Sequence, residues 1–445
     1  MKTNRFMKEQ NRIPTSKVQR ASRFVRTGAK VGGNYVKYYA RKTFNPKTTR
    51  ESLHSDNAED IYGGLSELKG SALKVLQMMS MDQNMLPTAY TDRFAMAQYS
   101  APPLSYPLVV KTFQQYFGKG PTEIYDTFSK KAKNAASIGQ VHEATLDGKR
   151  LAVKVQYPGV ADSVSSDLKI VKPFAIRLLN INERDLNHYM EEVEGKLIEE
   201  TDYELEVQRS VEISAQCGHI QDVFFPKYYP ELSAPRIITM DWLEGDHMRE
   251  FIAKNPSQEV RNRIGQALWD FYNHQVHYLK QVHADPHPGN FLMRMDGTMG
   301  VIDFGCVKII PEDFYHQYFT MIRKDITMKE DELNSIFYGL GFISDRDTEA
   351  EKKVFKQVFV DMIQLLGRPF HHGTFDFADD TYFRQIFEMS ERVSQMKEVK
   401  ESRTARGPRD ALYINRTYFG LYNLLNALQA RVVTHKPQWL AAVVA

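Results

Sequence analysis

A chain of 445 residues is too long for one hydrophobic core, so two or three structural units are expected. The hydrophobic fraction of 42% and the charged fraction of 25% are those of an ordinary soluble protein. The sequence contains no run of about 18 apolar residues, so we expect no membrane-spanning helix. The two cysteines, Cys217 and Cys306, exclude a disulfide framework and indicate a reducing compartment.

The net charge of +3 hides an asymmetry between the start of the chain and the rest. Residues 1–50 contain 14 Lys and Arg against one acid, Glu9, a local charge of +13, so the remaining residues carry −10. Residues 1–58 are predicted to form a basic, flexible arm that either contacts an anionic membrane surface or an acidic partner, or is simply a solvated tail. Nucleic-acid binding is disfavoured because aromatic residues are not interleaved with the basic ones and no nucleic-acid-binding fold is recognisable.

The arm also bears on localisation. It is poor in acids, as mitochondrial transit segments are, but it has no obvious serine-rich stretch. We therefore favour a bacterial cytoplasmic protein, peripheral at the inner face of the membrane, over a mitochondrial one.

Helices and a hairpin follow the arm. Apolar residues recur with helical spacing from Glu59 to Met81, and a second helix is expected from Tyr106 to Phe117. Ser137 to Thr145 and Arg150 to Val155 have strand character, and Asp147-Gly148 between them predicts a tight hairpin turn.

The second half of the chain is richer in helix. Asp162 to Ser214 has a long, charged helical pattern, a strand follows at Arg236 to Met240, and a strand pair is expected at Phe291 to Met295 and Gly300 to Ile302. A β-rich lobe followed by a helix-rich lobe is an α+β arrangement. The predicted order of units is a basic arm (1–58), an N-terminal helical extension (59–120), a β-rich lobe with accompanying helices (121–245) and a helical lobe (246–445).

The loop HADPHPGN at residues 283–290 is a candidate catalytic segment. It contains D-x-x-x-x-N at Asp285 and Asn290, and D-F-G begins at Asp303 after a short hairpin. The same spacing occurs in the catalytic and metal-binding loops of protein kinases. Asn290 and Asp303 offer oxygen ligands for magnesium, and Asp285 is placed to orient a nucleophile or accept its proton.

The two histidines of this loop have the spacing of a helical zinc site. Pro286 and Pro288 forbid a regular helix there. We therefore expect His283 and His287 to bond backbone groups of the loop.

The first half of the chain supplies the complementary groups. Lys154 in AVKVQ lies on a predicted strand, where its ammonium can reach phosphates. The carboxylate that keeps it charged and oriented is predicted to be Glu200 in IEETDYELE, with Glu199 as the local alternative. A kinase has a glycine-rich loop before the strand, but here the segment NAASIGQVH contains a single glycine, Gly139.

Five segments in this order, KNAASIGQVHEATL, LAVKVQYPGV, EETDYELE, HADPHPGNFLM and VIDFGCV, closely resemble the ABC1 (UbiB/COQ8) family of atypical kinases. The resemblance extends from about Tyr62 to about Ala430. It implies a two-lobed, protein-kinase-like fold that binds ATP and Mg²⁺, with ATPase activity coupled to ubiquinone or other prenyl-lipid metabolism. The roles that it implies are an ion pair of Lys154 with Glu200, a catalytic-loop position for Asp285, metal ligation by Asn290 and Asp303, and nucleotide contacts from Ala135, Ala136, Ser137, Ile138, Gly139, Gln140, Met240 and Trp242.

One family motif is altered. The family carries K-x-G-Q on an N-terminal helix that restricts access to the active site, and this chain has Lys74-Val75-Leu76-Gln77 instead. Lys74 and Gln77 keep one helical face, and Asp202 is a candidate tether for Lys74. Leu76 in place of glycine predicts a wider gap or a shifted register against the nucleotide loop.

Two kinase features are missing, and they bear on the substrate. Ala284 replaces the arginine of H-R-D, and no A-P-E follows Asp303 within forty residues. These absences argue against ordinary protein substrates and favour a lipid-like substrate or ATP hydrolysis. The alternatives are a small-molecule kinase with Asp285 as its base and an ATP-gated scaffold without turnover.

Overall fold

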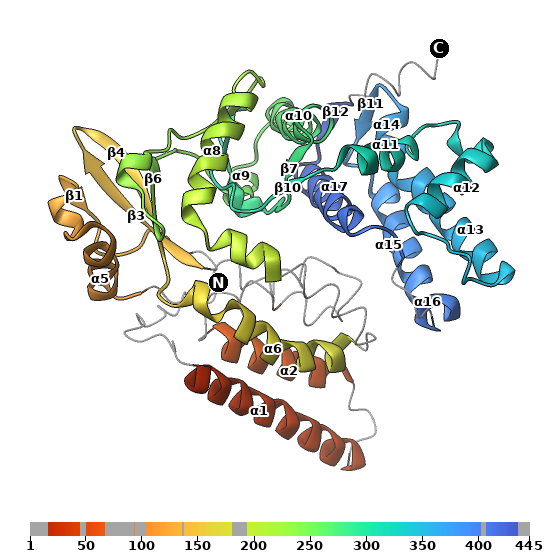
Figure 1. Ribbon diagram of the computed structural model, residues 1–445, viewed down its shortest axis with the longest axis horizontal. Helices are drawn as coiled ribbons and strands as arrows, with labels where there is room; N and C mark the ends of the chain where they lie inside the picture. Colours follow the sequence, from red (N-terminus) through yellow and green to blue (C-terminus); the bar gives the residue numbers. More distant parts are fainter. Residues whose placement is uncertain are drawn as a thin grey trace. The chain divides into compact units, whose positions relative to one another are not determined.

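The computed structural model of the protein describes residues 17–44, 50–66, 93, 104–135, 138–179, 194–401 and 406–434. The chain divides into two compact units, Met1–Gln208 with Lys227–Trp242, and Arg209–Pro226 with Leu243–Ala445 (Figure 1). The boundary that the sequence suggested after residue 245 lies close to the division after Trp242, whereas Arg209–Pro226 belongs to the second unit.

An antiparallel sheet forms the centre of the first unit, in the order β1-β3-β4-β6 with β2 pairing β3. Its strands are β1 (Thr127–Phe128), β2 (Asn134–Ala135), β3 (Gly139–Leu146), β4 (Lys149–Gln156) and β6 (Ile237–Asp241). The predicted hairpin is confirmed. Asp147 and Gly148 join β3 to β4 with φ of 49° and 73°, and this pair of positive values is what a two-residue type I′ turn requires.

Helix α5 (Tyr106–Phe117) has the bounds that the sequence predicted. Val109 and Phe113 on its buried face join the core of the sheet. The ring of Phe113 meets those of Tyr125 and Phe128 edge to face, at 6.1 and 5.5 Å between centroids.

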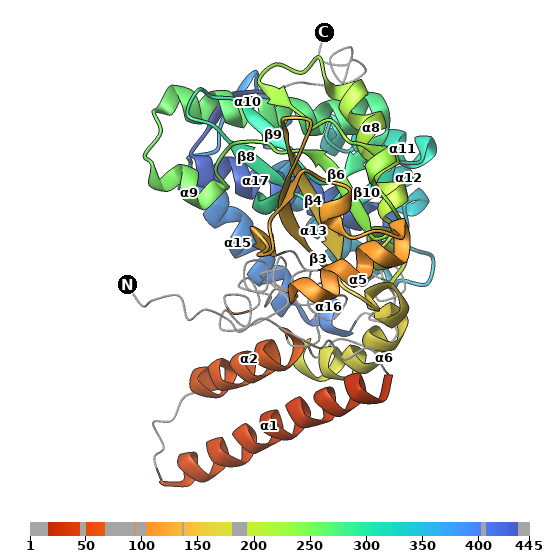
Figure 2. The ribbon, with the colours of Figure 1, turned by 90° about the vertical axis from the view of Figure 1, so that its left-hand side faces the viewer.

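Residues 17–44 and 50–58 of the basic start of the chain are helical and do not form a flexible arm, whereas residues 1–16 and 45–49 lie outside the described residues. Helices α1 (Lys17–Phe44) and α2 (Arg50–Ser66) lie alongside each other, and α1 also contacts α6 (Val160–Leu179) (Figures 1 and 2). Arg20 of α1 is buried, and its Nε donates to Oδ1 of Asp167 on α6 at 2.6 Å. Gly64 of α2 lets α1 approach α2 closely, because a Cβ on Gly64 would lie 2.0 Å from Oγ1 of Thr27 on α1. For residues 17–44 and 50–58 the prediction of a flexible arm was wrong, because a buried ion pair and a glycine contact, both made over long range, order these helices.

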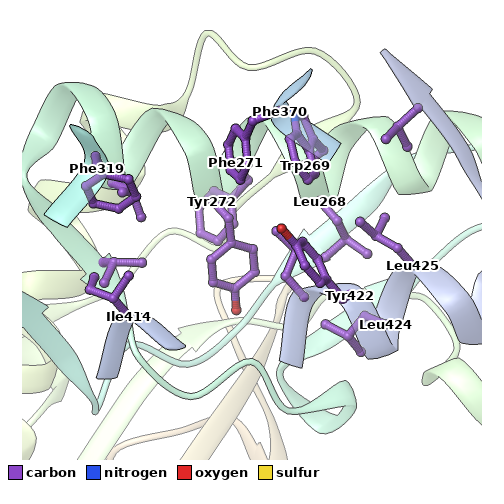
Figure 3. Packing of buried hydrophobic residues seen from close by; sticks show 14 of the residues in the cluster. Leu268, Trp269, Phe271, Tyr272, Phe319, Phe370, Ile414, Tyr422, Leu424 and Leu425 are labelled. Atoms are coloured by element: carbon purple, nitrogen blue, oxygen red, sulfur yellow. The ribbon is translucent and has the colours of Figure 1, made fainter. Parts of the chain in front are cut away.

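The second unit is mainly helical, and its core lies between α10 (Gln258–His274) and α17 (Arg409–Leu428). Figure 3 shows Trp269 and Tyr272 of α10 facing Tyr422 and Leu425 of α17, and all four are buried. The other helices are α8 (Tyr203–Cys217), which crosses the boundary between the units, α9 (Met248–Ala253), α11 (Glu312–Thr320), α12 (Glu330–Gly339), α13 (Glu349–Leu366), α14 (Arg368–His371), α15 (Asp380–Gln395) and α16 (Lys397–Glu401).

Short strands and turns connect these helices. The strands are β5 (Val223–Phe224), β8 (Phe291–Met293) and β9 (Met299–Val301) in one sheet, β7 (Gln281–His283) with β10 (Val307–Ile309), and β11 (Thr374–Asp376) with β12 (Arg431–Val433). The short helical turns of the second unit are η4 (Gln275–Leu279), η5 (Pro288–Asn290) and η6 (Ile326–Met328), whereas η2 (Pro121–Glu123) and η3 (Pro230–Leu232) belong to the first unit. Within the described ranges, no helix combines the length and the apolar character that crossing a membrane requires.

Candidate active site

Lys154 forms a buried ion pair in the first unit. Its side chain on β4 is 7% exposed, and Nζ lies 2.7 Å from Oε1 of Glu206, whose side chain is 2% exposed. Nζ also lies 5.0 Å from the ring centroid of Tyr203, one turn before Glu206 on α8. An ammonium or a carboxylate buried alone is strongly destabilising, so this pairing stabilises both charges.

The partner of Lys154 is therefore Glu206, and the prediction of Glu200 was wrong. Glu200 ends the helical segment 194–200 and is partly exposed. A new helix, α8, begins after Asp202, whose Oδ1 accepts a hydrogen bond from the N–H of Leu205 at 3.1 Å. This cap sets the rotation of α8 and turns Tyr203 and Glu206 to the same side. Asp202, directly before the helical spacing of Tyr203 and Glu206, was the N-cap signal for a helix start that the prediction overlooked.

The predicted nucleotide loop is described in part. Ala135 pairs with Gln140 across β2 and β3, whereas Ala136 and Ser137 lie outside the described residues. A Cβ on Gly139 would lie 2.7 Å from the hydroxyl of Tyr203 and 2.8 Å from the carbonyl oxygen of Val155. Glycine at this position therefore allows β3 to pass the residues next to Lys154.

Two residues of this loop turn their side chains inward. Ile138 is 2% exposed. The side chain of Gln140 is buried, and it accepts from the N–H of Leu104 at 2.6 Å and bonds Nε2 of His142 at 2.8 Å. Desolvation lowers the pKa of His142, so this chain of bonds joins neutral groups. The side chain of Gln140 is thus bonded within the protein and its backbone lies between β2 and β4, so its nucleotide contact stays a prediction.

The predicted adenine contact concerns Met240 and Trp242, at the end of β6. Met240 is buried and pairs with Ala152 of β4. The N–H of Trp242 donates to the carbonyl oxygen of Arg150 at 3.0 Å, and the guanidinium of Arg150 lies 4.6 Å from the Trp242 ring centroid. The adenine contact stays a prediction. The N–H of Trp242 cannot donate to adenine, because it already donates to Arg150.

In the second unit, β7 and β10 hold the two candidate catalytic loops together. The N–H of Ala284 donates to the carbonyl oxygen of Cys306 at 2.9 Å, and the N–H of Ile302 donates to that of Asn290 at 3.1 Å. His283 is fully buried, and its Nε2–H donates to the carbonyl oxygen of Asp303 at 2.6 Å. Residues 283–290 and 302–306 thus form one hydrogen-bonded assembly.

Two polar side chains of this assembly, the predicted metal ligands, have defined partners. Nδ2 of Asn290 donates to the carbonyl oxygen of Asp285 at 2.9 Å. The amide oxygen of the Asn290 side chain therefore faces away from that carbonyl. Oδ1 of Asp303 accepts from the N–H of Gly305 at 2.9 Å. Among the described residues, no cluster of three or more His, Cys, Asp or Glu is arranged to hold a metal ion. Two oxygen ligands fit a magnesium ion whose remaining ligands are waters and phosphate oxygens.

The histidines of the loop have the structural role expected of them. Burial lowers the pKa of His283, so it stays neutral and donates to a carbonyl oxygen. Nδ1 of His287 accepts from the N–H of Gly289 at 3.0 Å and closes the turn that leads to Asn290.

Helix α17 supports the catalytic loop from far along the chain, and the sequence analysis missed it. Nη2 of Arg416 donates to Oδ1 of Asp285 at 3.0 Å, across 131 residues of sequence. A Cβ on Gly420 would lie 2.1 Å from Cγ of Pro286, so α17 and the loop pack without space for a methyl group. Local sequence signals cannot predict contacts of this separation.

The regulatory residues are only partly described. Lys74 and Gln77 lie outside the described residues, so the altered K-x-G-Q motif and the tether from Asp202 to Lys74 stay predictions. What the structure assigns to Asp202 is the cap of α8.

Together, a β-rich unit with a buried lysine–glutamate pair and a helical unit with paired D-x-x-x-x-N and D-F-G loops define a protein-kinase-like fold. The family model of the ABC1 atypical kinase-like domain matches residues 96–336. The chain belongs to the ABC1 atypical kinase-like family.

Similar proteins cover nearly the whole chain. It is 25% identical over 447 residues to the probable serine/threonine-protein kinase abkA of Dictyostelium discoideum, covering 95% of this chain and 78% of the relative. It is 26% identical over 431 residues to the atypical kinase COQ8, mitochondrial, of Saccharomyces cerevisiae, covering 94% of this chain and 83% of the relative. Several other relatives are longer, and the chain spans between 40 and 64% of their lengths.

One solved structure is similar in fold and sequence. The complex of Rv3197 with erythromycin from Mycobacterium tuberculosis matches with a TM-score of 0.59 and 27% identity, covering 88% of this chain and 96% of that one. This similarity supports the kinase-like fold independently of the motifs.

Proposed function

We propose that the protein binds MgATP and hydrolyses it or transfers its γ-phosphate in support of ubiquinone or other prenyl-lipid metabolism. The observation that carries the proposal is the buried pair of Lys154 and Glu206. In kinases the equivalent lysine contacts the α- and β-phosphates and is oriented by a glutamate on a helix. A buried charge pair often contributes no net stability compared with apolar residues, so stability alone does not account for its presence here.

The residues of the second unit have complementary roles in this proposal. Asn290 and Asp303 would hold Mg²⁺, which supplies positive charge beside the phosphates. Asp285, positioned by Arg416, would orient the attacking water or acceptor hydroxyl. Ala284 occupies the position of the missing arginine and is buried against Cys306 and Tyr413. The substrate class therefore rests on the missing kinase features, which favour a lipid-like acceptor or water over protein.

The lipid setting rests on the family. A relative named COQ8 is described as mitochondrial, and the relative from M. tuberculosis was solved with erythromycin bound. Mitochondrial relatives do not favour the predicted bacterial origin, which stays a prediction.

The test is nucleotide turnover by the purified full chain, with Mg²⁺ and with or without quinone-precursor-like phenols. Asp303→Asn should lower ATP turnover by at least tenfold, whereas the exposed control Asp313→Asn on α11 should leave it unchanged. An Asp303→Asn protein that turns over ATP as fast as the parent would revive the scaffold alternative. Phosphate transfer to a diffusible metabolite in the absence of lipid would instead favour the small-molecule kinase.

Helix α1 offers a surface for peripheral contact with an anionic membrane. Its buried face includes Phe24 and Tyr38, whereas Val25 and Val36 are 72% and 71% exposed. These two valines are eleven residues apart, about three helical turns, so they lie on the same side of the helix. Exposed basic residues flank them, Arg26 and Lys37 among them. An apolar strip bordered by cations is the arrangement with which helices bind the interface of anionic bilayers.

Liposome flotation tests this contact with point variants, because α1 packs through Arg20 and its deletion would expose the buried face. Val25→Ser with Val36→Ser should reduce binding to anionic vesicles, and so should Arg26→Gln with Lys37→Gln. A matched control is Lys131→Gln, an exposed residue on another segment. Equal recovery with neutral and anionic lipids would contradict the electrostatic part of this proposal.

A further inference from the structure

The second unit contains an apolar cavity that no part of the proposed ATP chemistry uses. It has a volume of about 200 Å³ and lies among α11, α12, α13 and the first half of α17, which Figure 1 labels. Its walls are largely aromatic, with Phe319, Phe337, Phe342, Phe359 and Phe370 contributing. Protein interiors rarely leave voids much larger than a water molecule. This space is partly open to the surface and mostly apolar, as small-molecule sites are, so it is a candidate binding site.

The volume limits the occupant. An apolar cavity of about 150 Å³ stays dry and binds benzene. A cavity somewhat larger than this accepts a single ring with a short substituent, or an apolar chain of similar bulk. One polar group at its edge is already bonded within the protein, because the hydroxyl of Tyr422 donates to the carbonyl oxygen of Leu366 at 3.1 Å.

Two wall residues retain hydrogen-bond donors. The hydroxyl of Tyr318 donates to Oδ1 of Asn415, and no described residue accepts from the amide N–H groups of Asn415. The guanidinium of Arg406 donates through Nη1 and Nη2 to Asp347 at 2.9 and 2.7 Å. Its Nε is buried and has no acceptor among the described residues. The walls thus offer N–H donors, whereas the acceptors on Asn415 and Asp347 are occupied.

The charge of Arg406 does not call for an anion. Asp347 neutralises it, and that ion pair holds the pKa of Asp347 below its usual range. The guanidinium also lies 3.4 Å from the ring centroid of Phe355, which supports it on one side. A neutral ligand with an acceptor oxygen fits these walls better than a carboxylate or a phosphate, because neither anion would find an unpaired positive charge.

We propose that this cavity binds a small neutral molecule, one ring or an equivalent apolar body, that carries one hydrogen-bond acceptor such as a carbonyl oxygen. The apolar body fills the aromatic part of the cavity, and the oxygen accepts from the amide N–H groups of Asn415. Asn415 precedes Arg416, the residue that holds Asp285, so the occupant touches the helix that supports the catalytic loop.

The test measures binding to the full chain without nucleotide, so that its outcome is independent of the proposed ATP turnover. The probes are acetophenone and α-methylstyrene, which have nearly the same shape but differ in that the first has a carbonyl oxygen. Calorimetry and ligand-observed saturation-transfer NMR should show acetophenone binding about three- to tenfold more tightly, as expected for one neutral hydrogen bond.

Two variants locate the site. Ala411→Leu adds bulk to a buried wall position and should abolish the binding of both probes. Asn415→Leu with Tyr318→Phe removes a donor without leaving the tyrosine hydroxyl unpaired, and should reduce the affinity for acetophenone toward that for α-methylstyrene. Circular dichroism spectra and melting curves check that each variant is folded. The proposal is overturned if neither probe binds, if a folded Ala411→Leu protein binds both as the parent does, or if the hydrocarbon binds as tightly as the ketone.

Discussion

Replacing Glu206 by Gln tests the ion pair at the centre of the proposed site. Gln has nearly the shape of Glu and keeps a carbonyl oxygen for Lys154, but it removes the negative charge. The ammonium then stays in a position where the side chain of Lys154 is 7% exposed, without the carboxylate 2.7 Å away. Breaking a buried pair by removing one partner costs about 3 to 5 kcal/mol, and the retained acceptor places Glu206→Gln near the lower end, about 3 kcal/mol.

This loss should be visible in the nucleotide-free protein. A change of 1 kcal/mol shifts the Tm of a domain of 150–250 residues by about 2 to 4 °C, so the transition of the first unit should move down by about 6 to 12 °C. Urea unfolding followed by far-UV circular dichroism gives the free energy of unfolding, and intrinsic tryptophan fluorescence, to which Trp242 next to β6 contributes, is a second probe.

Two further variants make the reasoning refutable. Glu200→Gln changes the partly exposed residue first predicted as the partner, and it should cost less than about 1 kcal/mol. Lys154→Met with Glu206→Leu replaces the whole pair by apolar side chains, and should restore stability to within about 1 kcal/mol of the parent while ATP turnover stays abolished. If Glu206→Gln were as stable as the parent, or if Glu200→Gln cost more, Glu206 would not be the partner that keeps Lys154 charged.

The remaining predictions concern the second unit. Arg416→Gln should lower the kcat of ATP turnover about tenfold, because it removes one charge-assisted hydrogen bond to Asp285, and it should leave the KM for ATP unchanged. Arg416→Lys keeps the positive charge and should lower kcat less. Equal losses of kcat in both variants would contradict a role of the charge. Gly420→Ala should lower the free energy of unfolding by about 2 kcal/mol in urea titrations, because its Cβ would overlap Pro286; a more stable protein would show that helix propensity outweighs this contact. Burial lowers the pKa of His277 from 6.5 to about 3. Between these values the unfolded chain binds a proton that the folded protein does not, so the stability present above pH 6.5 is lost as the pH falls toward 3. The free energy of unfolding then changes by at most about 1.4 kcal/mol per pH unit, and unfolding experiments on His277→Gln should show a smaller pH dependence. An unchanged pH dependence would assign the effect to other groups.

Signals that act over a few residues were readable in the sequence. The Asp147-Gly148 turn, the strands on either side of it and the bounds of helix Tyr106–Phe117 follow from backbone preferences and apolar spacing, which depend on near neighbours. The same holds for the loops at Asp285, Asn290 and Asp303. Their spacing in the chain limits how far apart a short hairpin can place them.

Short-range signals could not decide between Glu200 and Glu206 as the partner of Lys154. Both lie in one acidic run, and a helix continued without interruption would have placed them differently around its axis. The cap at Asp202 restarts the helix, so the residue that turns toward Lys154 depends on where α8 begins and on β4 packing beside it.

By itself, the sequence determined which chemical groups are present, the local elements that carry them and the family to which they belong. Only the tertiary structure decided which charges meet: Glu206 with Lys154, Arg20 with Asp167, and Arg416 with Asp285. The physical reason is that these contacts join segments between 52 and 147 residues apart. At such separations the pairing is set by packing of whole elements, and no local backbone preference encodes it.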